Sequence, residues 1–427
     1  MATSPARRRP RLPPPDISAA EILDSLPPAM LDEILSRLPI RDAARTSVLS
    51  RAWRRRWESV PYPVLNWPRG TPSAPIDAVL EHRTCPVSEF RHQYVPETEF
   101  HLSDLWLLRL ASLGVQSLYL KFKWLKADGI VRIPHFHMLH SHIFSCLELA
   151  VLDLESCDFP GLQYGFAGFP NLTTISFCNV RFPRGLSGLE ALISSSSSLR
   201  RLRLENLRMP NKYEQWVIHA PNLQSLLISS VFDYGWQVDD LPSLEVAEIK
   251  LRNYSNDQEV VNLISRLDQA RILQLDMPCS LDNLLEGLPR SFVNLKSLSL
   301  HIPYCCLSSF LSIFCLVRKA PNLEVLDVEL GFHFEEDDEV DINVLNGQRA
   351  DDPFSSLTSV HMKNVTWDSY EMAFIQFILS EARQLEVLSI HESRGHLTSD
   401  EEAFVAAEVA RYRRASPAAN VVISRMP

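Results

Sequence analysis

The chain has 427 residues, of which 42 are Lys or Arg and 52 are Asp or Glu, so its formal net charge is −10. This acidity argues against a general binder of nucleic acid or anionic membranes, because such a protein needs a basic face. A hydrophobic content of 46%, with 61 leucines, is enough for a large core spread over two or three domains.

The eight cysteines are spread along the chain without a CxxC pair, which favours a reducing compartment. The longest apolar stretch, Cys305 to Val317, is too short to span a bilayer, and the first residues lack the apolar segment of a secretory signal. We therefore expect a protein of the nucleus or the cytoplasm, with no membrane or nucleic-acid partner.

Residues 1–20 are predicted to be a disordered tail. The first 15 residues hold four arginines, five prolines and no acid. The cluster Arg7-Arg8-Arg9-Pro10-Arg11 has two interpretations, a solubilising tail or a sequence read by a nuclear-import receptor. We favour the first.

Three short helices are predicted within residues 21–60. Apolar residues recur at helical spacing before Pro39, which ends the first helix. Asp42 is expected to cap the next helical stretch, which carries Trp53 and Trp57. So short a segment cannot enclose its many Leu, Ile and Trp side chains, so part of its apolar surface is expected to lie against another chain.

Beyond a predicted linker at 61–86, which starts with five prolines in 61–75, the chain is repetitive. The template LxxLxL begins at eleven positions that lie 21 to 34 residues apart, with a mean step of 27. These positions are Val115, Leu149, Leu172, Leu199, Leu223, Leu244, Ala270, Leu295, Leu323, Leu357 and Leu385. This period is typical of leucine-rich repeats, in which each unit adds one strand and one return helix to a solenoid. We assign 87–350 to an α/β leucine-rich-repeat horseshoe.

Amphipathic helices are predicted ahead of several strands, within 258–275, 307–328 and 370–390. The sequence Ala-Pro-Asn-Leu at 220–223 and 320–323 is predicted to turn the chain from helix to strand, because proline cannot continue a helix. The last predicted elements are a helix over 399–414, capped by Ser399, and a strand at Val421-Val422-Ile423.

Two longer steps between repeats predict insertions. One holds the acidic loop 335–341 with Asp351-Asp352. The other holds four histidines, His135, His137, His140 and His142. These imidazoles could hold zinc or copper, but the segment lacks a second group of ligands, so we favour a polar insertion over a metal site.

Residues 24–57 resemble the F-box of plant F-box/leucine-rich-repeat proteins. The resemblance rests on Leu26-Pro27, Leu31, Ile34-Leu35, Leu38-Pro39, Asp42-Ala43, Arg45-Thr46-Ser47-Val48-Leu49-Ser50, Trp53-Arg54 and Trp57. Residues 353–424 resemble the FBD domain that ends many of these proteins, through PFSSLTSVHMKN, QLEVLSI and RRASPAANVVI. The resemblance therefore predicts an α+β chain, with a three-helix F-box at 21–60, the repeats, and an FBD-type cap at 351–427.

This resemblance implies a substrate receptor of an SCF-type cullin–RING ubiquitin ligase. In that family the F-box binds a small Skp adaptor, which links it to the cullin and the RING protein, and the repeats hold the protein to be ubiquitinated. Such a receptor is not an enzyme and acts by proximity. The open alternative is a protein-binding scaffold that is not coupled to degradation.

The sequence offers no match to common catalytic motifs. A phosphate loop, a dinucleotide fingerprint, a zinc-protease helix, a hydrolase elbow and the paired Cys and His ligands of a RING domain are all missing from it. Cys157 and Cys178 follow repeat strands, where a small apolar side chain is ordinary. We predict no catalytic residue, cofactor or metal.

Two binding surfaces are predicted. The apolar stripe of the F-box is expected to dock into an adaptor groove through Leu26, Pro27, Leu31, Ile34, Leu35, Leu38, Pro39, Val48, Leu49 and Trp53. The tryptophans have the alternative role of packing the helices together, which we favour for Trp57. The outward positions of the repeat strands are expected to bind the substrate, with Arg201, Arg203, Glu248, Lys250, Asp327, Glu329 and His361 chosen as contacts. For any single one of these, an ordinary solvated charge is the alternative.

Overall fold

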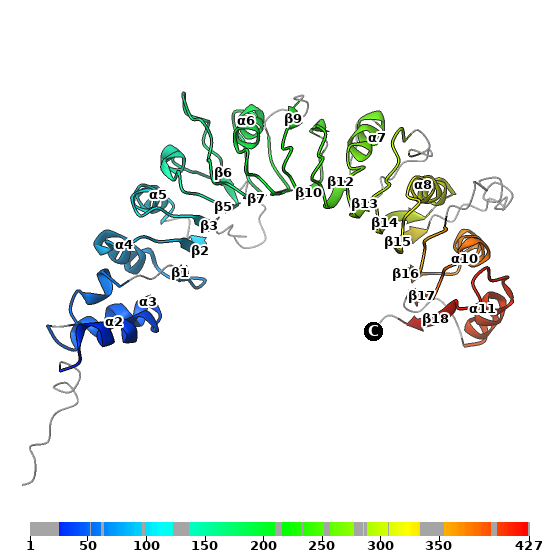
Figure 1. Cartoon of the computed structure of the whole chain (residues 1–427), viewed down its shortest axis with the longest axis horizontal. Helices are drawn as coiled ribbons and strands as arrows, with labels where there is room; N and C mark the ends of the chain where they lie inside the picture. Colours follow the sequence, from blue (N-terminus) through cyan, green and yellow to red (C-terminus); the bar gives the residue numbers. More distant parts are fainter. Residues whose placement is uncertain are drawn as a thin grey trace, which may run out of the picture.

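A computed structural model shows the chain as a curved solenoid (Figure 1). The structure describes residues 25–51, 53–60, 64–95, 99–122, 136–209, 216–232, 234–251, 257–276, 285, 288–305, 307–333, 354–393 and 399–425. The predicted tail at 1–20, the acidic loop at 335–341, the pair Asp351-Asp352 and His135 lie outside these residues. Strands line the inner side of the arc and helices lie along its outer side, which agrees with the predicted α/β solenoid.

The N-terminal helical unit consists of two α-helices and short 3-10 turns in the part of 25–60 that is described. These elements are α2 (Pro28–Ser36), α3 (Ile40–Arg45), η1 (Thr46–Val48) and η2 (Arg56–Glu58). Pro28 occupies the first helical position of α2, where a missing N–H costs no hydrogen bond.

Two predictions for this unit are wrong. Asp42 does not cap a helix, because α3 already begins after Pro39 and the carboxylate lies in its first turn. The stretch with Trp53 and Trp57 is not a continuous helix, because α3 gives way to 3-10 turns after Arg45. Serine, threonine and valine follow there, and all three are weak helix formers.

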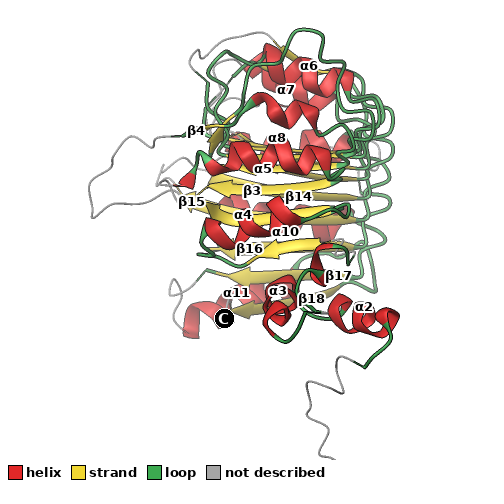
Figure 2. Cartoon of the chain, turned by 90° about the vertical axis from the view of Figure 1, so that its left-hand side faces the viewer, coloured by secondary structure: helices red, strands yellow, loops and turns green. Residues whose placement is uncertain are grey.

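In the part of the chain that the structure describes, fourteen parallel strands form one continuous sheet, and their spatial order is their order in the sequence. They are β1 (Val64–Trp67), β2 (Glu89–Val95), β3 (Ser117–Phe122), β5 (Val151–Glu155), β7 (Thr174–Cys178), β8 (Arg201–Glu205), β10 (Ser225–Ser230), β12 (Val246–Leu251), β13 (Ile272–Asp276), β14 (Ser297–Cys305), β15 (Val325–His333), β16 (Ser359–Val365), β17 (Val387–Glu392) and β18 (Asn420–Arg425). Figure 2 shows them side by side and running in one direction. Each repeat therefore packs mainly against its two neighbours.

The leucines of the template form the core of the solenoid. In β8, Leu202 and Leu204 are buried while Arg201 and Arg203 are exposed, and the adjoining strands keep the same register. This alternation is the period of two that a strand imposes. Each inward Leu or Ile gains roughly 1.5–3 kcal/mol from burial, so stacking makes stable what a single repeat cannot.

Helices cover most of the outer side. They are α4 (Ser73–His82), α5 (Leu102–Ser112), η4 (Ser141–Ser145), α6 (Ser187–Ser195), α7 (Asp257–Ser265), α8 (Leu307–Arg318), α10 (Ser369–Glu381) and α11 (Ser399–Arg411). The three helices predicted ahead of strands are confirmed as α7, α8 and α10. Small parallel pairs also occur on this side: β4 (His137–Met138) with β6 (Cys157–Asp158), and β9 (Trp216–Ile218) with β11 (Trp236–Val238).

The segments 220–223 and 320–323 form the predicted turns. In both, the leucine N–H donates to the alanine carbonyl, at 3.0 and 3.2 Å. The side chains of Asn222 and Asn322 each donate to a carbonyl of the preceding repeat, at 2.9 and 2.8 Å. The asparagine of this motif therefore ties one repeat to the next.

The predicted linker at 61–86 is wrong. The segment contains β1 and α4, and β1 pairs in register with β2, so it forms a repeat of the same sheet. Leu65 and Trp67 of β1 point inward and are buried. Two of the prolines that suggested a linker sit where a helix tolerates them, Pro72 before α4 and Pro75 in its first turn.

The C-terminal residues continue the same architecture. The predicted final helix and strand are confirmed as α11 and β18, and β16, β17 and β18 are the last strands of the sheet. The helix α10 starts with a capping box in which the Asp368 carboxylate accepts from the Glu371 N–H and the Glu371 carboxylate accepts from the Asp368 N–H. The side chain of Ser399, the predicted cap of α11, is outside the description.

Candidate functional site

The predicted adaptor-binding residues fall into two groups according to their burial. Leu31, Leu35 and Trp53 are buried and pack inside the helical unit, together with Trp57. Leu31 and Leu35 lie one turn apart, so they share the inward face of α2. These side chains support the surface of the unit and do not form it.

The remaining predicted residues lie at the surface. Pro27, Ile34, Pro39, Val48 and Leu49 are exposed, and Leu26 and Leu38 are partly buried. Met30, which is not among the predicted contacts, is also exposed. We call Pro27, Met30, Ile34, Pro39, Val48 and Leu49 the exposed apolar set.

The exposed apolar set leaves much apolar surface in water. Met30, Ile34, Val48 and Leu49 are 56%, 38%, 86% and 50% exposed. Single exposed apolar side chains are ordinary, but four large ones on a unit of about three dozen residues indicate a binding surface. A helical rotation of 100° per residue explains why Met30 points outward beside the buried Leu31.

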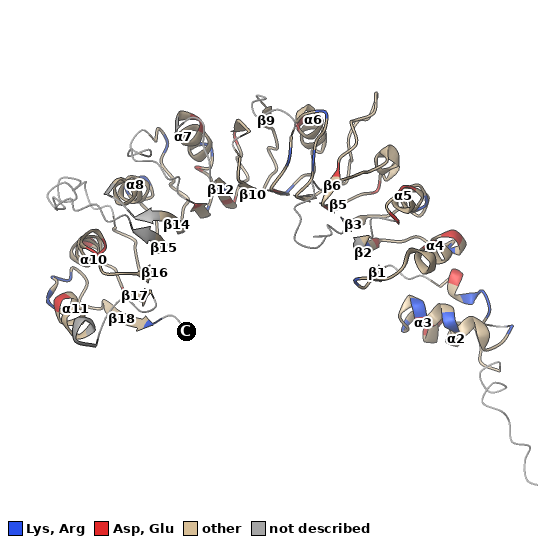
Figure 3. Cartoon of the chain, turned by 180° about the vertical axis from the view of Figure 1, so that it is seen from behind, with Lys and Arg blue, Asp and Glu red and all other residues tan. Residues whose placement is uncertain are grey.

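The helical unit is basic although the whole chain is acidic. Residues 25–60 hold seven arginines against four acids, and Figure 3 shows Lys and Arg positions on this unit in blue. Arg56 holds the unit together: its guanidinium donates to Asp32 at 2.6 Å and to the Pro28 carbonyl at 2.6 Å. This arginine therefore clamps η2 onto the start of α2.

The helical unit is attached directly to the first repeat. The Thr84 N–H donates to the Glu58 carbonyl at 3.4 Å, and the Cys85 thiol donates to the Ser59 carbonyl at 2.9 Å.

A cavity of about 810 Å³ lies between α3 and the β1–α4 connection. It is lined by Pro39, Ile40, Arg41, Asp42, Arg45, Val64, Asn66, Trp67, Pro68, Arg69, Gly70, Thr71, Pro72 and Pro75.

The residues predicted to bind substrate all lie at outward positions of the sheet. Arg201 and Arg203 are on β8, Glu248 and Lys250 on β12, Asp327 and Glu329 on β15, and His361 on β16. None of them is buried. The register places Asp327 beside His361 on the next strand, so these two belong to one local surface.

Many charges on the concave face are paired with each other. Lys121 contacts Glu155 at 2.8 Å, Lys250 contacts Glu248 at 2.5 Å, and Arg203 contacts Glu205. Exposed pairs of this kind contribute at most about 1 kcal/mol to stability. They leave the concave face polar and nearly balanced in charge.

The histidine segment is part of the packed structure and not a free insertion. His137 lies in β4 between Phe100 and Phe122, with ring centroids 5.2 and 5.3 Å away. Its Nε2 is 3.0 Å from the Ser103 hydroxyl and 3.6 Å from Asp104. Burial lowers the pKa of His137, although Asp104 opposes the shift. Among the residues that are described, no group of three or more His, Cys, Asp and Glu is arranged to hold a metal ion.

Cys157 and Cys178, which lie on strands, and Cys146, which follows η4, are poor nucleophiles. Burial raises the pKa of Cys146 to about 12 and that of Cys178 to about 11, and it raises the pKa of Cys157 well above its ordinary value. The thiolate is the reactive form, so a raised pKa disfavours covalent chemistry. Packing in the repeats accounts for these residues.

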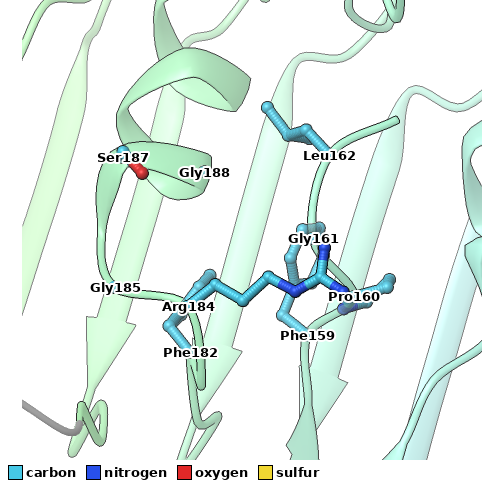
Figure 4. Close-up of a pocket in the computed structure, with 9 residues that line it drawn as sticks. All are labelled: Phe159, Pro160, Gly161, Leu162, Phe182, Arg184, Gly185, Ser187 and Gly188. Carbon is cyan, nitrogen blue, oxygen red and sulfur yellow. The ribbon is translucent and has the colours of Figure 1, made fainter. Parts of the chain in front are cut away.

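A smaller cavity lies beside α6 (Figure 4) and has a volume of about 260 Å³. The Arg184 side chain extends across it toward Pro160 and Gly161. A Cβ on Gly161 would lie 2.5 Å from the Arg184 Nη1, so the glycine makes room for the guanidinium. The cavity lining offers one hydroxyl, that of Ser187, and neither a histidine nor a carboxylate.

Comparison with known families assigns the two parts of this architecture. The F-box domain family matches residues 23–64, and the family described as "FBD-associated F-box protein At5g56370, LRR repeats" matches residues 103–265. The protein is thus of the leucine-rich-repeat class, with an F-box at its N-terminal side. None of the described helices has the length and apolar character needed to cross a membrane.

Relatives from Arabidopsis thaliana share this organisation. The F-box/FBD/LRR-repeat protein At1g13570 is 26% identical, over 94% of this chain and 98% of its own length. The FBD-associated F-box protein At5g38590 is 25% identical, over 87% and 94% of the two chains. The F-box/FBD/LRR-repeat protein At2g04230 is 28% identical, over 60% and 63%. These matches agree with the resemblance seen in the sequence: the chain is similar to plant F-box/LRR-repeat proteins, with the F-box match at its N-terminal side and the repeat match behind it.

Proposed function

We propose that this protein is the substrate-recognition subunit of an SCF-type cullin–RING E3 ubiquitin ligase. The F-box docks a Skp-type adaptor, which links it to a cullin and a RING protein, and the concave face holds the target protein. The observation that carries the proposal is the exposed apolar set on a unit that matches the F-box family. Uncovered apolar surface of this kind is what a partner's groove removes from water.

The adaptor contacts divide into direct and supporting residues. Direct contact comes from Pro27, Met30, Ile34, Pro39, Val48 and Leu49, with Leu26 and Leu38 at the margin. Leu31, Leu35 and Trp53 act through the packing that holds these side chains in place. The substrate contacts lie among Arg201, Arg203, Glu248, Lys250, Asp327, Glu329 and His361.

The proposed receptor accelerates ubiquitination without making a bond itself. The F-box is tied by hydrogen bonds to the first repeat of a continuous sheet, so the adaptor site and the concave face belong to one body. Holding a target at a fixed place raises the effective concentration of its lysines near the activated ubiquitin. The receptor therefore needs no catalytic residue, cofactor or metal of its own.

The domain organisation follows the same proposal. The F-box occupies 21–60, the repeats begin at the strand β1 and run to about residue 350, and 351–427 forms an FBD-type end of the solenoid. The protein works in the nucleus or the cytoplasm, where this ligase class meets its targets, and has no nucleic-acid or membrane partner.

The test is the affinity of the full chain for a purified Skp-type adaptor, measured by calorimetry. Ile34→Asp and Val48→Asp are each expected to weaken binding by roughly 30-fold or more, since a central interface contact is worth about 2 kcal/mol or more. Phe404→Asp is the matched control, because Phe404 is an equally apolar side chain, 69% exposed on α11. Equal affinities for the three variants would reject the F-box assignment.

The scaffold alternative makes a different prediction in cells. A receptor shortens the half-life of the proteins it binds, and a proteasome inhibitor restores it, whereas a scaffold leaves the half-life unchanged. Proximity labelling with and without the inhibitor identifies the proteins to follow. Ile34→Asp should stabilise a true target without releasing it from the repeats.

A further inference from the structure

Two arginines project from β8 into the centre of the concave face. Arg201 and Arg203 are both exposed, two residues apart on one strand. Their partners in register on β7 and β10 are Thr174, Ser176, Ser225 and Leu227. The arginines are thus flanked on both sides by uncharged residues, three of which carry a hydroxyl group.

Arg201 differs from the cations on and near its own strand. Among the described residues, the Arg201 Nε donates a hydrogen bond to the Thr174 hydroxyl at 3.2 Å. This hydroxyl oxygen is an uncharged acceptor. Arg203, Lys121 and Lys250 each contact a carboxylate instead. The charge of Arg201 is therefore offset less by the protein than the charges of Arg203, Lys121 and Lys250, and it is available for an external carboxylate, which a guanidinium binds with two parallel hydrogen bonds.

An apolar pair lies two and three strands further along the sheet. Val246 on β12 and Ile272 on β13 are neighbours in register, and both are outward residues. Ile272 is 47% exposed, an unusual place for a large branched side chain. Leu227 on β10, also partly exposed, lies between this pair and the arginines.

The spacing of the strands converts these positions into a sequence pattern. Strands in a sheet lie about 4.8 Å apart, and Arg201, Val246 and Ile272 share one row of the register, so Val246 and Ile272 are roughly 10 and 14 Å from Arg201 along that row. An extended peptide advances about 3.3 Å per residue. A segment that crosses the strands therefore spans the distance in three or four residues.

We propose that Arg201, with Val246 and Ile272, reads an extended segment of the target in which Asp or Glu lies three or four residues from Val, Ile or Leu. This inference rests on the proposed function and names the class of substrate for its concave face. Two nearby carboxylates, Glu205 on the same strand and Glu248 on β12, contact Arg203 and Lys250 respectively, so they compete little for Arg201.

The test is the selection of a random dodecapeptide display library on the immobilised full chain. The enriched peptides should carry the acidic and the branched apolar residue at the proposed separation. A synthetic peptide of the enriched sequence should bind Arg201→Gln roughly tenfold more weakly, and Ile272→Asp more weakly by a similar factor. Arg200→Gln is the matched control, since it removes the same charge one residue before β8.

A charge reversal makes the test specific. Arg201→Glu should no longer bind the acidic peptide. It should bind instead the same peptide with Lys in place of the acidic residue. Thermal unfolding of each variant shows that it is folded, because an exposed position should not change the midpoint. Enriched peptides without an acid, or equal effects of Arg201→Gln and Arg200→Gln, would overturn the proposal.

The adaptor measurement separates the two possible failures. If Arg201→Glu keeps the acidic peptide while the wild-type chain still binds the adaptor, the substrate inference is wrong and the receptor function stands. If the wild-type chain binds no Skp-type adaptor but shows the proposed peptide preference, the ligase function is wrong and the peptide site on the concave face stands.

Discussion

The F-box and the repeats treat their apolar side chains in opposite ways. In the repeats, the stacked neighbours bury the inward residues of the strands from β1 to β17, and the outward residues are mostly polar. In the F-box, Leu31 and Leu35 are buried while Ile34 and Val48 remain in water. The solenoid completes its own core by repetition, whereas the F-box is too short to cover its apolar surface.

The two regions therefore differ in which side chains determine their stability and which determine their function. Stability of the repeats should depend on buried volume within the chain, and function of the F-box should depend on exposed residues that contribute little to folding. Substitutions in the two regions should therefore separate folding from binding.

The largest effect on folding is expected from truncating an inward leucine of the sheet. Leu226→Ala on β10 removes a buried side chain and should cost about 2–5 kcal/mol of unfolding free energy. Leu227→Ala, one residue along the same strand, is the control and should cost much less, because that side chain faces outward. Urea unfolding of both variants measures the difference, and equal losses would contradict the alternation of the strand.

A smaller effect is expected where two strands approach closely. Gly331 on β15 faces Pro303 on β14, and a Cβ added there would meet the Pro303 carbonyl and lie 2.8 Å from the Ile302 oxygen. Because these are backbone atoms, Gly331→Ala should cost about 1–3 kcal/mol. Gly161→Ala should cost less, since Arg184, which it would displace, is a flexible and exposed side chain. Thermal unfolding midpoints that rank the two the other way would contradict this.

Within the F-box, the clamp of Arg56 is expected to matter by about 1 kcal/mol. Arg56→Ala removes its bonds to Asp32 and to the Pro28 carbonyl and should loosen α2, lowering adaptor affinity indirectly. Arg55→Ala, which removes an exposed pair with Glu58, should change affinity less. If Arg55→Ala proves the more damaging, the clamp does not hold the F-box together.

The smallest effect is expected on how the stability of the first repeats depends on pH. His92 on β2 is buried against Trp106, with ring centroids 5.3 Å apart, and burial lowers its pKa below the ordinary value near 6.5 while the charge of Glu99 opposes the shift. The unfolded chain then binds the proton more tightly than the folded chain, so stability is full above pH of about 6.5 and falls as the pH decreases toward the folded pKa.

His92→Phe should therefore reduce the loss of the thermal midpoint between neutral and mildly acidic buffer by a few degrees. His82→Phe, on the exposed side of α4, is the control for replacing an imidazole by a phenyl ring. An identical pH dependence in the wild type and His92→Phe would show that another group is responsible.

Much of the fold could be predicted from the sequence because repetition amplifies a weak signal. The leucine period predicted the strands from Val115 onward, and they lie in the sheet in sequence order. The repeat at β1 was missed because its prolines resemble those of a linker, and only the tertiary pairing with β2 shows that they start a helix. The stretch after Arg45 was wrongly predicted to continue as one helix, because its apolar residues have helical spacing although they lie in separate short 3-10 turns.

The candidate sites could be predicted only in part. The sequence selected the correct segment of the F-box, but apolar character alone could not separate Leu35, which faces inward, from Ile34, which faces outward. Helical rotation would also have selected Met30. On the concave face the alternation of the strand gave the outward residues, but it could not show that Lys250 contacts Glu248 on its own strand whereas Arg201 contacts the Thr174 hydroxyl on the next strand, because side-chain conformation in the folded sheet decides this.

The most direct test of the account is hydrogen–deuterium exchange of the full chain with and without a saturating Skp-type adaptor. We predict slower exchange in peptides from α2, α3 and η1, and no change in peptides from β8, β12 and β13, which stay open for the target. Unchanged exchange over α2 and α3, or protection of the concave strands by the adaptor, would contradict the claim that the F-box is the part of this molecule built to be covered.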